Sequence, residues 1–339
     1  MMKFYRLIMC CALICNFYTK AYAESHENDT KPQFIFPVAC VYGEDCWAVN
    51  YVDVDPAPEA IKDFNCKRKS YDGHKGTDFA LGSVQHMKEG VDVFAAADGR
   101  ILRVRDGEDD RLKTKEEFQE IDEAKKNCGN GVFIDHANGV QTIYCHLKKD
   151  SIVVKPKQRI KAGEKIGQVG QSGEAQFPHL HFGVIWEGGV VDPYTGALNT
   201  QGCNQEKDPL WHAGLPIKYE PVAIFDGGFQ SQLPDFEAIQ KGSVYPETIS
   251  LSSAIFTFWV GFYNVEINDR VTIKITDPDG MLFTKREEVV KETRARQYYY
   301  TGRKIGRVQL KSGTYKASVA FSRKEDGIKR EKEFSVIVE

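Results

Sequence analysis

The alternation of apolar and polar positions predicts a chain built mainly of β-strands. In its first two thirds, seven short segments are rich in β-branched and aromatic residues and are separated by turns that contain glycine. Regular spacing of this kind is typical of an antiparallel sheet. The predicted strands span residues 77–81, 91–95, 100–104, 132–136, 140–147, 165–169 and 181–186. We expect this sheet to carry a functional groove on one face.

A second set of strand-like segments follows residue 217. Four runs alternate or are continuously apolar, and the second contains the turn sequence DPDG: TISLSSAIFTFWVGF, RVTIKITDPDGML, GTYKASVAF and KEFSVIVE. They predict a small β-sandwich over residues 218–339 that resembles immunoglobulin-like modules. A chain of 339 residues exceeds what one core usually organises, so we expect residues 205–217 to link this sandwich to an antiparallel-sheet domain at 71–204. The predicted fold class is therefore mainly β.

Residues 105–127 interrupt the strand pattern. This insertion is rich in charged residues and helix formers, and Phe118 and Ile121 recur at helical spacing. The pattern predicts a short surface helix. The insertion is either a solvated excursion, which is the simpler interpretation, or a wall of the groove.

The first 23 residues combine a basic start, a short apolar run and small residues at Ala21 and Ala23. This composition predicts a cleavable secretory signal. The apolar run is shorter than the roughly 20 residues of a membrane-spanning helix, so we expect no transmembrane span after cleavage. Residues 24–70 are expected to form a disulfide-tied lead-in, which either supports the packing of the next domain or covers its site as a latency segment.

Charge and cysteine content narrow the class of protein. A net charge of −3 argues against a nucleic-acid partner. Six cysteines remain after the predicted signal, and in an exported protein this even number indicates up to three disulfides. If residues 135–140 form a hairpin tip, antiparallel pairing brings residue 130 opposite about residue 145. We therefore predict a Cys128–Cys145 disulfide and an exported protein, either periplasmic or secreted.

Two motifs carry candidate metal ligands. In YDGHKGTDFA, His74 and Asp78 stand four positions apart beside glycines that favour a loop entering a strand. In HLHF, strand alternation places His179 and His181 on one face and the residues between and after them towards the core. A catalytic zinc usually has three nitrogen or oxygen ligands and a fourth position for water. The first pair and one histidine of the second motif fit this set.

A fifth candidate group lies in TIYCHL, at His146. Alternation predicts that Tyr144 shares its face and that Cys145 and Leu147 lie on the other. We assign no chemistry to the four remaining histidines, His26, His86, His136 and His212.

The motifs H-x-x-x-D and H-x-H, together with GNGVFIDHANG, KAGEKIGQVGQSG and VDPY, resemble the lysostaphin-type zinc metallo-endopeptidases, which are LytM-like, beta-lytic enzymes that cut peptide cross-links in bacterial peptidoglycan. The resemblance covers residues 71–195. It implies a lysostaphin-like antiparallel sheet, with Zn²⁺ bound by His74, Asp78 and His181. It also implies that His146 and His179 are catalytic histidines beside the metal-bound water.

Two other functions stay open. The domain could be a non-catalytic peptidoglycan-binding or hydrolase-activating module, although all five family positions are filled here. It could also be a secreted zinc protease with another peptide substrate. Because every candidate catalytic residue precedes residue 199, we expect cleavage itself not to require the C-terminal sandwich.

Overall fold

The computed structural model describes residues 32–215, 217–242, 245–306 and 309–339. Lys31–Glu339 form one compact unit. The predicted signal and His26 lie outside the described residues. Among those described, no helix combines the length and apolar character that a membrane span requires.

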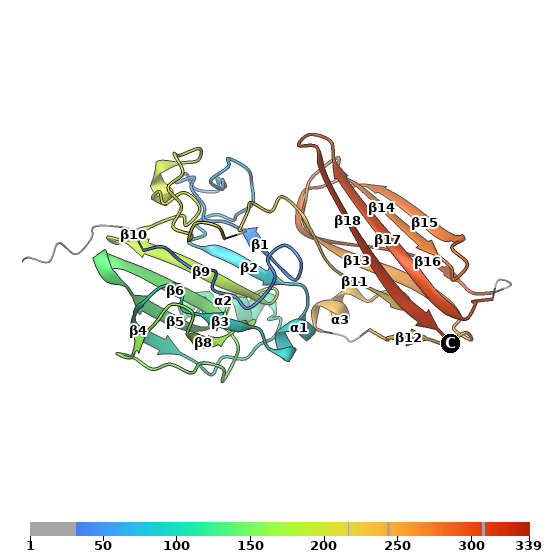
Figure 1. Ribbon diagram of the computed structural model, residues 1–339, viewed down its shortest axis with the longest axis horizontal. Helices are drawn as coiled ribbons and strands as arrows, with labels where there is room; N and C mark the ends of the chain where they lie inside the picture. The colour runs from blue at the N-terminus through green and yellow to red at the C-terminus, as the bar shows by residue number, and fades with distance from the viewer. Residues whose placement is uncertain (1–31, 216, 243–244, 307–308) are drawn as a thin grey trace, which may run out of the picture. The chain divides into compact units, whose positions relative to one another are not determined.

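The largest sheet has eight antiparallel strands in the order β1-β2-β9-β6-β5-β4-β7, with β10 paired to β9 (Figure 1). Their bounds are β1 Cys46–Asn50, β2 Thr77–Leu81, β4 Gly99–Arg105, β5 Asn130–Asp135, β6 Val140–Leu147, β7 Arg159–Ile160, β9 His179–Trp186 and β10 Gly189–Val190. β3 (Asp92–Phe94) and β8 (Lys165–Gln168) pair separately. All seven predicted strands are present, which confirms the mainly β fold class.

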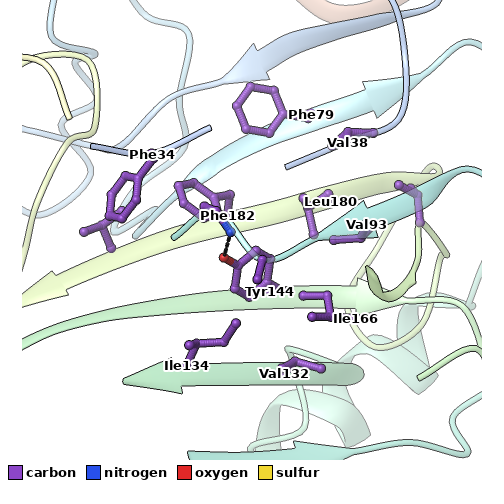
Figure 2. Close-up of a cluster of buried hydrophobic side chains, with 14 of the residues drawn as sticks. Phe34, Val38, Phe79, Val93, Val132, Ile134, Tyr144, Ile166, Leu180 and Phe182 are labelled. Atoms are coloured by element: carbon purple, nitrogen blue, oxygen red, sulfur yellow. Dashed lines mark hydrogen bonds between the residues drawn. The ribbon is translucent and has the colours of Figure 1, made fainter. Parts of the chain in front are cut away.

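Side-chain alternation on the central strands separates a core from an opposite face. Phe79, Leu180 and Phe182 are fully buried in the core shown in Figure 2. Asp78 pairs with His181, and Ala80 with His179, on the other face. Burying each large apolar side chain contributes about 1.5–3 kcal/mol, so the core fixes which residues the opposite face presents.

The hairpin between β5 and β6 differs from the predicted register by two residues. Asn130 pairs with Leu147, whereas Val132 pairs with Tyr144, so a bulge lies between the two pairs. The predicted Cys128–Cys145 disulfide is nevertheless confirmed. The other cysteines pair as Cys40–Cys46 and Cys66–Cys203.

The insertion contains the predicted short surface helix, α2 (Lys115–Glu123), and none of its residues is buried. Thr114 and Glu117 cap its start reciprocally, with the Thr114 amide 2.8 Å from the Glu117 carboxylate. The segment before the helix is anchored, because the Asp110 carboxylate accepts the main-chain N–H groups of Lys149 and Gln171. The described residues also form the α-helices α1 (Val84–Glu89) and α3 (Phe236–Gln240).

Two further sheets form the C-terminal part of the chain (Figure 1). One has the order β11-β13-β16 and the other β12-β18-β17-β14-β15, with only β12 and β18 parallel. Their bounds are β11 Ala223–Gln230, β12 Thr248–Ile249, β13 Ile255–Val265, β14 Arg270–Thr276, β15 Leu282–Val289, β16 Arg294–Lys304, β17 Gly313–Arg323 and β18 Ile328–Val338. They enclose a core in which Phe256 contacts Tyr315 and Phe262 lies near Phe321.

The three-stranded sheet also packs its outer face on the eight-stranded sheet. Phe225 and Tyr263 join Trp47, Val49 and Ala80 in a separate buried apolar cluster. The Tyr263 hydroxyl donates to the Leu81 carbonyl at 3.2 Å. Ala80 shares its sheet face with His179, so the C-terminal sheet lies on the face that carries the candidate site residues.

The segment expected to link the two regions packs into the first core. Leu210 and Trp211 are buried there, and the Phe34 amide donates to the Leu210 carbonyl at 2.6 Å. The Trp211 ring also lies near Phe182.

Candidate metal centre

Three predicted ligands converge on one point. Nε2 of His74 is 3.0 Å from Oδ1 of Asp78 and 3.1 Å from Nδ1 of His181, and the Asp78 and His181 atoms are 3.0 Å apart. Donors of a tetrahedral zinc with bonds of about 2.0–2.1 Å are separated by roughly 3.3 Å. The cluster is therefore slightly tighter than a loaded site and needs only a small expansion. It could hold a metal ion with two nitrogen donors and one oxygen donor.

The local fold delivers each donor. His74 lies on the loop that leads into β2, and Asp78 lies within β2 directly opposite His181 of β9. Gly76 makes room between them, because a Cβ atom there would lie 2.6 Å from Nε2 of His181. The glycine between the two ligands of the first motif therefore has a steric role.

The lead-in supports the cluster from outside. Nδ1 of His74 lies 2.7 Å from the Tyr51 carbonyl oxygen, and Nδ2 of Asn50 donates to Oδ2 of Asp78 at 2.9 Å. A carbonyl oxygen only accepts, so Nδ1 carries the proton and Nε2 presents its lone pair to the cluster. The sequence analysis did not predict either partner. A main-chain carbonyl has no sequence signature, and a single asparagine cannot be told from any other asparagine in the chain.

His146 and His179 flank the cluster. Nδ1 of His179 bonds the Phe177 carbonyl at 2.9 Å, and Nδ1 of His146 bonds the Ser172 carbonyl at 2.8 Å. Both rings therefore keep Nε2 for the site. Their centroids are 4.6 Å apart, and Nε2 of His179 is 3.6 Å from Oδ1 of Asp78. All five predicted residues are thus brought together.

The position of His146 does not follow from strand alternation. Tyr144, predicted on its face, packs in the core against Phe182, whereas Cys145 pairs with His181. That face prediction is wrong because His146 has a φ of 60°, which interrupts the extended backbone. Its amide donates to the Cys128 carbonyl at 2.8 Å.

A close backbone crossing fixes the Ser172 carbonyl that orients His146. Gly129 and Gly173 both have positive φ, at 59° and 68°. A Cβ atom on Gly129 would lie 2.4 Å from the Ser172 carbonyl carbon, and one on Gly173 would lie 2.3 Å from the Gly129 nitrogen. The GNG and QSG sequences therefore contribute the space that this crossing needs.

The environment sets the charge of the site. Burial would raise the pKa of the Asp78 carboxyl, but its interactions with His74, His179 and His181 hold that pKa well below its usual range. Burial lowers the pKa of His146 well below its usual value, and the neighbouring histidines lower it further. Burial also lowers the pKa of His181. An ionised carboxylate and neutral imidazoles are the forms that bind a divalent metal.

Two of the other described histidines, His136 and His212, form hydrogen bonds outside the cluster. Both ring nitrogens of His136 are used, at 2.7 Å from the Asp98 carbonyl and 2.7 Å from the Thr142 hydroxyl. His212 is exposed and bonds the carbonyl of Ala213. The Cys40 and Cys46 sulfurs near Asp45 are joined in a disulfide, so they offer no thiolate.

Residues 72–193 match the model of peptidase family M23. A DD-carboxypeptidase/endopeptidase Mpg of Neisseria meningitidis serogroup B is 34% identical over 132 residues, which are 39% of this chain and 24% of that protein. The peptidoglycan DD-endopeptidase ShyB of Vibrio cholerae is 34% identical over 151 residues, which are 43% of this chain and 29% of that protein.

Among solved structures, a zinc-containing peptidase from Vibrio cholerae is 30% identical with a TM-score of 0.28, covering 44% of this chain and 40% of that chain. The lysostaphin catalytic domain from Staphylococcus simulans is 20% identical with a TM-score of 0.27, covering 42% and 85% of the two chains.

The chain spans about a quarter of the length of the curated relatives it matches, at 24% of one and 29% of the other. The matched segment contains all five clustered residues, His74, Asp78, His146, His179 and His181. Residues 72–193 are therefore similar in sequence to the peptidases of family M23.

Proposed function

We propose that the chain is a zinc-dependent endopeptidase that hydrolyses peptide cross-links of bacterial peptidoglycan. The observation that carries this proposal is the convergence of His74, Asp78 and His181, whose donor atoms lie 3.0–3.1 Å apart. Two more histidines lie beside them with Nε2 available. Relatives named as peptidoglycan DD-endopeptidases support the choice of substrate.

His74, Asp78 and His181 would hold the metal, and a zinc ion bound there would polarise the scissile carbonyl and acidify water. His146 and His179 perform the proton transfers. With Nδ1–H donated to a carbonyl, each Nε2 can accept a proton from the attacking water and return it to the departing amine. The fixed Nδ1 bonds keep both rings aimed at the reacting group.

The disulfides and the proposed substrate support an exported protein. Three disulfides lie within the described residues, and such bonds persist in oxidising compartments. Peptidoglycan also lies outside the cytoplasm. We therefore place the protein in the periplasm or outside the cell.

Digestion of purified sacculi tests the proposal, with the released muropeptides identified by mass spectrometry. The zinc-loaded protein should convert cross-linked dimers into monomers, and chelation followed by zinc addition should abolish and restore this conversion. A protein that binds sacculi and zinc but releases no monomer would be a binding module instead.

A further inference from the structure

A cavity of about 230 Å³ lies between the lead-in and the C-terminal sheet. Its walls come from segment 66–70, the end of β13 and the start of β16. Four of its lining side chains are cationic and one is acidic: Lys67, Arg68, Lys69 and Arg294 against Glu266. The excess of cations favours an anionic occupant.

The ammonium of Lys69 is poorly compensated. The residue is only 5% exposed, and Nζ lies 3.5 Å from Oε1 of Glu266. The same oxygen is 2.7 Å from Nη1 of Arg323, so two cations share it. Nζ also lies 5.0 Å from the centroid of the Tyr219 ring. A buried charge needs a close carboxylate, and Glu266 gives Lys69 only a long and shared contact.

Two guanidinium groups can also reach an occupant. Among the described residues, none forms a hydrogen bond or an ion pair with Arg68. Arg294 pairs with Glu292, but both side chains are more than half exposed, so this pair is weak. Guanidinium groups recognise carboxylates through paired N–H donors.

The side chain of Asn50 connects the cavity to the metal centre. Asn50 lines the cavity and donates to Asp78 at 2.9 Å. Tyr71, next to lining residue Ser70, lies over the His74 ring with centroids 4.2 Å apart. A peptide crossing the metal centre could therefore place a nearby acidic group in the cavity.

We infer that this cavity is a subsite for a free carboxylate of the peptide substrate. This inference rests on the proposed function and adds to it that the enzyme prefers acidic peptides. Arg68 comes from the lead-in and Arg294 from β16, so both segments determine specificity. The C-terminal sheet thus contributes a substrate contact.

The experiment compares a soluble cross-linked muropeptide dimer in its free-acid form with the same dimer after amidation of its carboxylates. Wild-type protein should show a KM roughly tenfold lower for the free acid, the scale of a charge-assisted contact. Arg68→Gln and Arg294→Gln should remove this difference with kcat unchanged. Arg159→Gln, an exposed change on the opposite edge strand β7, should retain it.

Equal KM values for the two dimers in wild-type protein overturn the inference while leaving hydrolysis intact. Equal losses on both dimers in the two arginine variants also overturn it. Binding of each dimer is measured in parallel by calorimetry. If neither dimer is cleaved but the acid form binds more tightly through Arg68, the subsite stands and the proposed hydrolysis fails.

Discussion

Main-chain carbonyl groups orient three of the four clustered histidines. His74, His146 and His179 each commit Nδ1 to such an oxygen, within 2.7–2.9 Å. The imidazoles and the Asp78 carboxylate can be recognised in the sequence, because their residue types are common metal ligands and proton-transfer groups. The carbonyl groups that orient them cannot be recognised, because every residue type has a main-chain carbonyl. All five candidate residues could therefore be predicted, but their orientations could not.

The proposed division between ligands and proton-transfer groups predicts different outcomes for alanine variants. His181→Ala should lose both zinc and activity, because it removes one of three donors. His146→Ala and His179→Ala should keep near-stoichiometric zinc while kcat falls by roughly 10² to 10⁴. Elemental analysis and kcat are measured side by side. Loss of zinc in His179→Ala with retention in His181→Ala would reverse the roles.

Asp192 predicts a dependence of stability on pH. Burial raises the pKa of this carboxyl to about 7, although main-chain N–H groups of Tyr194 and Thr195 oppose the shift. A raised folded-state pKa adds stability that is complete below the unfolded value of about 3.9 and is lost as pH rises through about 7. Tm should therefore decline between about pH 4 and pH 7 by this contribution.

Asp192→Asn is the matched control for that decline. It keeps an oxygen for the Tyr194 amide, 2.7 Å from Oδ1, and removes the ionisation. Its Tm should fall less steeply than that of the wild type over the same range. Parallel curves for the two proteins would assign the decline to other groups.

Strand alternation is reliable only where the backbone stays extended. It correctly placed His179 and His181 on one face of β9, because that strand is regular from end to end. It failed at the end of β6, where His146 turns into the left-handed region. The sequence around this histidine contains no residue pattern that predicts a left-handed backbone there. The same limit explains the two-residue error in register, because the extra residue of the bulge lies in β6 beside His146.

The hairpin disulfide should matter for catalysis more than for metal binding. Cys128 accepts the His146 amide through its carbonyl, and Cys145 directly precedes that histidine. Replacing both cysteines by serine should lower kcat while zinc content stays near one per chain. The same change should cost roughly 3 kcal/mol of stability, the scale for a short closed loop.

Replacing Cys40 and Cys46 by serine serves as the comparison, since that pair closes a shorter loop away from His146. Its kcat should stay close to wild type. An equal fall in kcat for both double variants would point to general loosening of the fold.

Packing between the sheets changes what we expect of the C-terminal region. The residues Trp47, Val49 and Ala80 are at most 3% exposed because β11 and β13 cover them. The strand pattern predicted two β regions, but the apolar residues of an edge strand do not show which surface they pack against. The contacts between the two regions could therefore be identified only from the structure.

A chain truncated after Lys207 should lose stability and activity together, because it exposes this apolar cluster beside Asp78 and also removes Leu210 and Trp211 from the first core. The loss should be similar on soluble muropeptide dimers and on intact sacculi. Tyr263→Phe, which removes only the hydroxyl bond to Leu81, should retain most activity. Full activity of a folded truncated chain on the soluble dimer would restore our first expectation, that cleavage needs only the residues before 199.

The position of strand β13 affects how the molecule unfolds. One of its faces belongs to the C-terminal core, and on the other face Tyr263 joins the cluster shared with β1 and β2. All but the first residue of the strand are buried. Neither region can open fully without releasing this strand. Calorimetry should therefore record a single melting transition, and the β13 amide protons should be among the slowest to exchange with deuterated water.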